Sequence, residues 1–260
     1  MMTLLVLGFG GLTAGMLGGL LGIGGGILIM PLLRFVMHLE PAYAAGTCVV
    51  AVFFTTLGGG LKHFKLGHID FRSILPIMVS GLISTLIFSL LFFYLSKKGV
   101  WLDAATGVVF CLVALRMMWE GVAEYLKKGR SDGSGARIEG SILSKTSIGA
   151  LAGILPGILG IGTGAVLVPA FAFALSAPIK IAIGSSLACF SLNALASSLL
   201  KMWQGFVQIN ILIPLCLGTL IGARIGAALN DKVNSAFLKV SFGTVFMYIA
   251  SKYLTIFGVP

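Results

Sequence analysis

Two stretches of this sequence share one pattern: residues 20–33 read LLGIGGGILIMPLL, and residues 158–171 read ILGIGTGAVLVPAF. Gly22 aligns with Gly160, and the spacing between these two glycines is called the repeat offset below. The same offset relates Pro76 to Pro214, so the alignment continues without gaps over about sixty residues. The chain therefore contains an internal duplication, and duplications of this kind are typical of secondary transporters, whose substrate site lies between the repeats.

The composition excludes a water-soluble globular protein. Of 260 residues, 58% are hydrophobic and only 10% are charged, whereas ordinary soluble domains carry about 25% charged residues. A bilayer core requires about 20 apolar residues per helix, so seven or eight spans would use nearly all of the apolar residues. We expect an all-α polytopic membrane protein with the lipid bilayer as its surroundings.

The glycine-rich runs at 3–37 and 146–176 are too long and too interrupted for one straight helix each. We predict that each forms a broken helical hairpin or a re-entrant segment. Simple transmembrane helices are expected at 43–61, 74–95, 101–122, 182–202, 209–230 and 236–257. The polar, Gly/Ser-rich segment 127–145 is predicted to be a cytoplasmic linker between a first repeat (1–126) and a second repeat (146–260).

The distribution of lysine and arginine favours one orientation of the repeats, because cytoplasmic loops carry the basic excess. If each glycine-rich run crosses the membrane once, the halves are parallel and nine basic residues lie on the linker side against seven opposite. If each run folds back, the halves are inverted and the counts are twelve against four. We therefore predict two inverted-topology repeats, each with three further transmembrane helices, and both termini outside. The net charge of +10 then reflects topology, and no nucleic-acid partner is expected.

The broken helices supply the chemistry of a small-anion site. A helix broken within the membrane leaves N–H groups unpaired at the N-terminus of a half-helix, where the dipole favours an anion. Glycine lets a ligand approach that backbone closely. Tight helix packing through small residues is the alternative explanation of the same pattern. The predicted substrate contacts in these segments are Gly22, Gly24, Gly25, Gly26, Gly160, Gly162, Thr163 and Gly164.

A polar stripe follows in the next span, where Ser186, Cys189, Asn193 and Ser197 share one helix face. These groups suit either an oxyanion or contacts between helices. Arg224 either extends from a membrane end or draws anions by its charge, and Arg116 is placed to pair with Glu120 at i+4. Further predicted substrate contacts are Cys48, Thr55, Ser186, Cys189, Asn193 and Arg224.

Several kinds of chemistry lack their motifs. The four cysteines lie in apolar runs without metal-ligand spacing, and the sequence contains no HExxH, GxSxG or Walker A motif. We expect no enzyme activity, no cofactor and no metal, and nothing in the sequence specifies an oligomeric state. The titratable residues His63, His68, Asp70, Asp103, Glu120 and Glu124 are near predicted helix ends, and we assign them to solvated loops rather than to a proton relay.

The duplicated motif GxxGIGGGxxxxP, which contains Gly22 and Pro31 and recurs at Gly160 and Pro169, resembles the TauE/SafE-type sulfite exporter family of bacterial and archaeal membrane permeases. The element GTLIGARIGA at 218–227 supports the resemblance, and Thr163 departs from it by replacing a glycine. The resemblance implies transport of sulfite, sulfonates or related small anions across the cytoplasmic membrane, usually outward. A passive anion channel and an uptake permease for a related sulfur compound are the alternatives.

Overall fold

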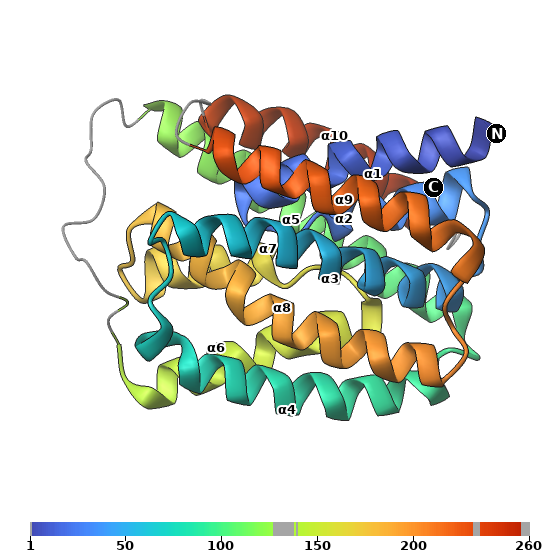
Figure 1. Ribbon diagram of the computed structural model, residues 1–260, viewed down its shortest axis with the longest axis horizontal. Coiled ribbons are helices and arrows are strands. Elements are labelled where there is room, and N and C mark those ends of the chain that lie inside the picture. The colour runs from blue at the N-terminus through green and yellow to red at the C-terminus, as the bar shows by residue number, and fades with distance from the viewer. Residues whose placement is uncertain (1, 127–137, 139, 231–234, 256–260) are drawn as a thin grey trace.

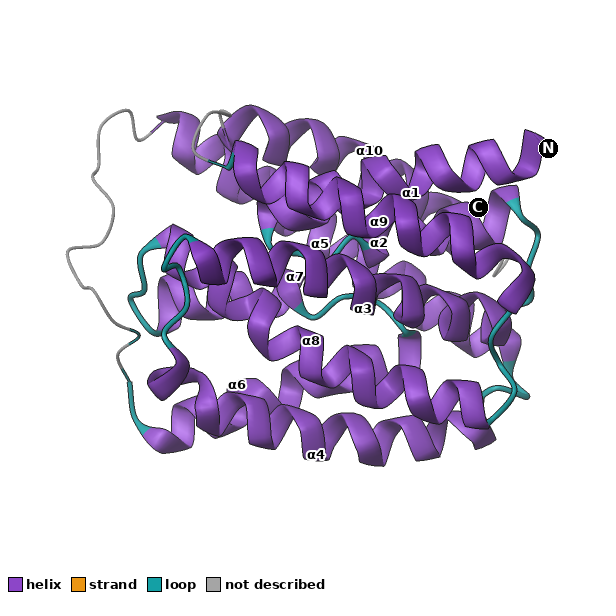
Figure 2. Cartoon of the chain, in the orientation of Figure 1, coloured by secondary structure: helices purple, strands orange, loops and turns teal. Residues whose placement is uncertain are grey.

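The computed structural model describes residues 2–126, 138, 140–230 and 235–255, and within these ranges the chain forms helices and no strand (Figure 1, Figure 2). The first repeat contains α1 (Met2–Leu21), α2 (Gly26–Pro31), the π-helical η1 (Leu32–Val36), α3 (Pro41–Lys65), α4 (Phe71–Leu95) and α5 (Gly99–Leu126). The second contains α6 (Ile142–Ile154), the π-helical η2 (Leu155–Leu159), α7 (Gly164–Pro169), the π-helical η3 (Ala170–Ala174), α8 (Ile179–Trp203), α9 (Ile209–Leu229) and α10 (Ser235–Thr255).

Seven helical segments within the described residues are long and apolar enough to cross a membrane. The predicted all-α polytopic membrane protein is therefore confirmed. Each predicted span coincides with a helix, and most of these helices extend a few residues further; 43–61, for example, lies within Pro41–Lys65, whereas 209–230 ends one residue beyond α9 (Ile209–Leu229). Residues 256 and 257 of the last span lie outside the described residues. The first helix of the second repeat begins at Ile142, within the predicted linker, because the Ser141 hydroxyl accepts the Ser144 N–H at 3.2 Å and caps it.

The duplication is visible in the helix boundaries. α2 begins at Gly26 and α7 at Gly164, while α3 begins at Pro41 and α8 at Ile179, and both pairs are related by the repeat offset. Both glycine-rich runs are broken, at 22–25 between α1 and α2 and at 160–163 between η2 and α7. Gly22, Gly24 and Gly25 have φ between +72° and +79°, a region that residues with a Cβ rarely adopt.

The repeats pack against each other reciprocally. α1 packs on α9 of the other repeat, and α6 packs on α4. A Cβ at Gly15 would collide with the backbone of Thr219, and one at Gly153 would collide with the backbone of Gly81. The repeat offset relates Gly15 to Gly153 and Gly81 to Thr219, so the same pair of positions meets twice, once in each direction between the repeats. Exchanged contacts of this kind are the pattern expected of two repeats related by an approximate two-fold axis. In Figure 1, α3 ends and α8 begins at the same end of the bundle, so these equivalent helices run in opposite directions.

Helices α3 and α8 lie at the centre and pack against each other. Among the seven spans they are the most enclosed: 78% of the residues in the apolar stretch of α3 are buried, and 61% of those in the apolar stretch of α8. α8 carries the predicted polar stripe, whose side chains are buried and therefore face protein rather than lipid.

Candidate functional site

The two breaks face each other in the interior of the bundle. A Cβ at Gly26 would lie 2.8 Å from the Gly162 amide nitrogen, and one at Gly164 would collide with the Gly22 carbonyl oxygen. In Figure 1 the yellow connection that leads into α7 runs through the middle of the molecule. The absence of side chains at these glycines therefore allows the backbones of both repeats to touch.

Each short helix begins with N–H groups that have no acceptor among the described residues. In α2 the amides of Leu28 and Ile29 both bond to the Gly25 carbonyl, whereas those of Gly26 and Ile27 have no acceptor in the described structure. The corresponding amide of Gly164 in α7 likewise has no acceptor in the described structure. Because α2 continues without interruption into η1, these amides stand at the positive end of one continuous helical segment, Gly26–Val36.

Thr163 adds a side-chain donor at this place. It occupies the position of Gly25 in the second repeat, its exposed fraction is 0%, and its hydroxyl has no hydrogen-bond partner in the described part of the chain. Buried hydroxyls almost always have a partner. The residue that departs from the glycine pattern is thus a candidate contact for a ligand between the breaks.

The side chains at Cys48 and Ser186, which are equivalent positions on α3 and α8, hold the breaks in place. The Ser186 hydroxyl donates to the Gly22 carbonyl at 3.0 Å, and the Cys48 thiol lies 3.6 Å from the Gly26 carbonyl. These predicted substrate contacts therefore bond to the broken backbone itself.

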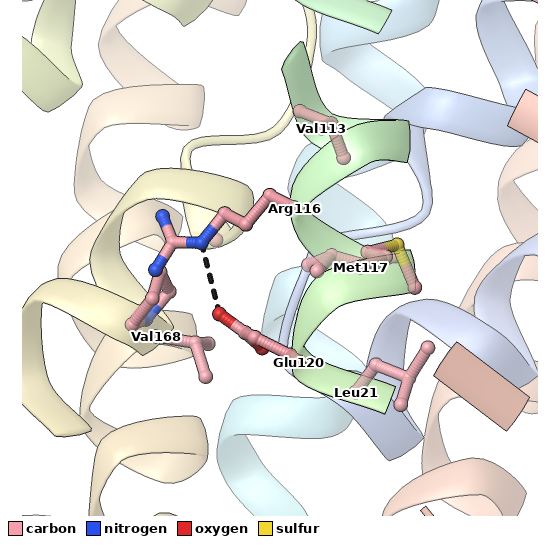
Figure 3. A pocket seen from close by; sticks show the side chains of 9 residues that line it. Leu21, Val113, Arg116, Met117, Glu120 and Val168 are labelled. Atoms are coloured by element: carbon pink, nitrogen blue, oxygen red, sulfur yellow. Dashed lines mark hydrogen bonds and ion pairs between the residues drawn. The ribbon is translucent and has the colours of Figure 1, made fainter. Parts of the chain in front are cut away.

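A small cavity borders both breaks. It has a volume of about 40 Å³ and is lined by Leu21 and Ile23 on one side and by Gly164 and Val168 on the other. Figure 3 shows Arg116 and Glu120 of α5 at this cavity, where the Arg116 Nε donates to the Glu120 carboxylate at 2.9 Å. A liquid water molecule occupies about 30 Å³, so the cavity has room for little more than one water.

The other predicted contacts on α3 and α8 are Thr55, Asn193 and Cys189. Thr55 packs its methyl group toward Gly25 but donates its hydroxyl to Ala51 at 3.1 Å within its own helix. Asn193 is buried against Gly81 of α4, and its side-chain oxygen has no partner among the described residues. Cys189 lies in an apolar cluster.

Arg224 is exposed and separate from the breaks. It lines another cavity, of about 670 Å³, together with Lys62 and Lys65. The predicted attraction of anions by its charge therefore stays a prediction, and it concerns this cavity rather than the breaks.

Two buried cationic or titratable side chains occupy equivalent positions on α3 and α8. His63 is 0% exposed, its Nε2 lies 3.3 Å from the Gly19 carbonyl, and its Nδ1 lies 3.2 Å from Nδ1 of His68. Lys201 is also 0% exposed and donates to the Pro156 carbonyl at 3.2 Å. The repeat offset relates His63 to Lys201 in the sequence, and this was a signal that could have identified them.

The assignment of His63 and Asp103 to solvated loops is wrong. Asp103 is 3% exposed, and its carboxylate binds Arg34 at 2.7 Å. This ion pair fastens η1, the segment that follows the first break, to α5. Both residues were misassigned because they lie close to the ends of apolar runs, where hydropathy does not distinguish a loop from the last turn of a buried helix.

No group of three or more His, Cys, Asp or Glu side chains in the described ranges is arranged to hold a metal ion. Cys48, Cys189 and Cys216 are free thiols buried among other side chains.

Comparison with known proteins agrees with this architecture. Residues 7–253 match the family described as Sulfite exporter TauE/SafE. The chain is 28% identical over 247 residues to a probable membrane transporter protein, YunE, of Bacillus subtilis, covering 86% of this chain and 88% of that protein. It is 29% identical over 259 residues to a probable membrane transporter protein of Xylella fastidiosa, covering 95% and 93%. No solved structure matches. This multi-pass membrane protein belongs to the TauE/SafE sulfite exporter family.

Proposed function

We propose that the protein is a secondary transporter that exports small sulfur-containing anions, such as sulfite or organosulfonates, by alternating access. The observation that supports this most directly is the contact between the two breaks, where Gly26 and Gly164 present unpaired amides beside the unpartnered hydroxyl of Thr163. Donors of this kind, held in a dehydrated place, recognise the oxygens of a small oxyanion.

We further propose that the repeats are inverted across the cytoplasmic (inner) membrane. The basic residues that support this lie near the end of the bundle where α3 ends and α8 begins, and they are Lys62, Lys65, Arg72, Lys145, Lys180 and Arg224. The positive-inside rule assigns that end to the cytoplasm. The breaks then lie close to the membrane midplane, as in other transporters with inverted repeats.

In this mechanism the anion binds between α2 and α7 and the repeats rock about the breaks. The small volume of the cavity at the breaks, about 40 Å³, supports a carrier rather than an open channel, because a channel needs a continuous pore. Outward movement of one negative charge across 100 mV is favourable by about 2.3 kcal/mol. Export therefore needs neither a catalytic step nor a cofactor.

Purified protein in detergent tests the ligand class. Titration with sulfite, sulfate, thiosulfate, sulfoacetate and taurine should raise the melting temperature with sulfite or a sulfonate, because a ligand that binds only the folded state stabilises it. In proteoliposomes, unlabelled sulfite inside should accelerate uptake of labelled sulfite. No stabilisation by any of these anions would refute the ligand class, and flux without acceleration would favour a channel.

The Gly162→Ala variant tests the site. Its Cβ would collide with the Ile23 carbonyl oxygen across the repeat interface, whereas a Cβ at Gly8 would meet nothing within 4 Å. We expect Gly162→Ala to reduce sulfite counterflow at least tenfold while still inserting into the membrane, and Gly8→Ala to retain wild-type counterflow. Equal activity of the two variants would contradict a site at the breaks.

A further inference from the structure

Two cavities lie at equivalent places in the two repeats. One, of about 670 Å³, is lined in part by Lys65 and Ala228, and the other, of about 430 Å³, is lined in part by Trp203 and Leu90. The repeat offset relates Lys65 to Trp203 and Leu90 to Ala228. α3 ends at Lys65 and α8 at Trp203, and these two helices end at opposite ends of the bundle (Figure 1), so one cavity lies toward each end.

A buried side chain lies beside each cavity and contacts the helix that precedes a break. It is His63 of α3 at the first cavity and Lys201 of α8 at the second. His63 follows Lys62, which lines the first cavity, and it contacts the Gly19 carbonyl near the end of α1. Lys201 is two residues from Trp203, which lines the second cavity, and it bonds to the Pro156 carbonyl of η2. Each of these two residues thus lies between a residue that lines a cavity and the helix that precedes a break.

Lys201 has fewer polar partners than a buried ammonium group requires to offset its loss of hydration. It is 0% exposed, with one hydrogen bond to Pro156 and the ring of Phe92 at 4.1 Å. The ion pairs found in the described ranges involve other residues. An ammonium has three donors, and an uncompensated charge inside a membrane protein is costly enough to indicate a function by default.

Polar groups connect Lys201 to the cavity at Trp203. Gln204, which lines that cavity, donates to the Ser89 carbonyl at 2.9 Å. The Ser89 hydroxyl lies 3.2 Å from that of Ser197, which donates to the Pro156 carbonyl at 2.7 Å. Lys201 bonds to this same carbonyl, so the polar route runs from the cavity to the helix that precedes the second break.

We propose that Lys201 is an anion-binding residue in the half of the transport path toward the end of the bundle where α8 ends, where the transported oxyanion supplies its missing counter-ion. This inference rests on the proposed function and extends it. The anion moves from the break along Ser197 and Ser89 to the cavity at Gln204, and Lys201 holds it during that step. In this structure, the side-chain nitrogen of Lys201 contacts the Pro156 carbonyl and the Phe92 ring instead.

The competing explanation is that Lys201 only caps the helix ending at Leu159 by bonding to a carbonyl of its last turn. Two substitutions separate these explanations. Lys201→Gln keeps N–H donors for the Pro156 carbonyl but removes the charge, whereas Lys201→Arg keeps both charge and donors.

The test is counterflow of labelled sulfite in proteoliposomes, with the sulfite-dependent rise in melting temperature as a second readout. We expect Lys201→Gln to lose at least tenfold in apparent sulfite affinity and Lys201→Arg to stay within about threefold of wild type. Lys252→Gln serves as the control, because Lys252 is exposed on α10 with its ammonium 5.5 Å from the Tyr248 ring. It should behave as wild type.

Wild-type affinity in Lys201→Gln would overturn the inference and leave the proposed function standing, as would equal losses in Lys201→Gln and Lys201→Arg. Absence of sulfite counterflow in the wild-type protein would refute the proposed substrate, and this inference with it. If Lys201→Gln does not fold, Lys201→Met replaces it, because an apolar side chain of similar length is tolerated where a charge is buried. Wild-type sulfite affinity in Lys201→Met would likewise overturn the inference.

Discussion

At the scale of single residues, removal of the Thr163 hydroxyl should affect stability and ligand binding in opposite directions. It is fully buried without a partner in the described structure, and such a group costs about 1–3 kcal/mol in desolvation. Thr163→Val removes the hydroxyl at nearly constant shape. We expect the melting temperature without ligand to rise by a few degrees, while the further rise caused by sulfite becomes smaller because a ligand contact is lost.

Thr55→Val is the matched control for this substitution. Thr55 is equally buried, but its hydroxyl donates to the Ala51 carbonyl at 3.1 Å. Its removal should lower the melting temperature and leave the rise caused by sulfite unchanged. A lower melting temperature in Thr163→Val would show that its hydroxyl has a partner in the membrane, and an unchanged response to sulfite would exclude it from the site.

The residues at the breaks were predictable because glycine and proline report backbone geometry directly. Gly24, at φ +79°, is an example. His63 and Lys201 could not be recognised by hydropathy, because their burial depends on a helix end contributed from elsewhere in the chain. The predicted span ended at residue 61, yet α3 continues to Lys65, and this extra turn carries His63 against Gly19 of α1.

At the scale of elements, the attachment of η1 to α5 fixes where the first broken segment ends. Arg34 and Asp103 form this attachment, with side chains 22% and 4% exposed. Asp103→Asn leaves Arg34 without its counter-charge. We expect a loss near the lower end of the roughly 3–5 kcal/mol observed when a buried pair is broken, measured as a fall in melting temperature in one detergent.

The other described ion pair provides the comparison. Arg116 and Glu120 lie one turn apart on α5, with side chains 37% and 15% exposed, and exposed pairs of this spacing contribute about 0.3–0.5 kcal/mol. Glu120→Gln should therefore change the melting temperature much less than Asp103→Asn. Equal effects would show that the Arg34 pair does not anchor η1.

At the scale of the whole molecule, the sequence predicted two repeats but not how they pack. A constant offset fixes which residues are equivalent, whereas the pairing of α1 with α9 and of α6 with α4 depends on the axis that relates the repeats. Glycines at matched positions, such as Gly15 and Gly153, are needed at these crossings because each meets a backbone of the other repeat. The glycine-rich pattern therefore serves two compatible purposes: it allows close packing between the repeats, and it allows the helices to break.

The proposed orientation in the membrane makes a prediction about equivalent positions. Lys65 and Trp203 are both exposed and are related by the repeat offset, so inverted repeats place them on opposite sides of the membrane. Single cysteines at these positions, in a background where Cys111 is replaced by serine because the other three native thiols are buried, can be labelled in intact cells with a maleimide that does not cross membranes.

We expect the reagent to label Trp203→Cys in right-side-out membranes and to label Lys65→Cys only after the membrane is disrupted. Labelling of both from one side would mean parallel repeats, and the breaks would then have no reason to meet at the midplane. Labelling of Lys65→Cys alone would keep the inverted arrangement but reverse it, so that the cavity with Lys62, Lys65 and Arg224 would face outward.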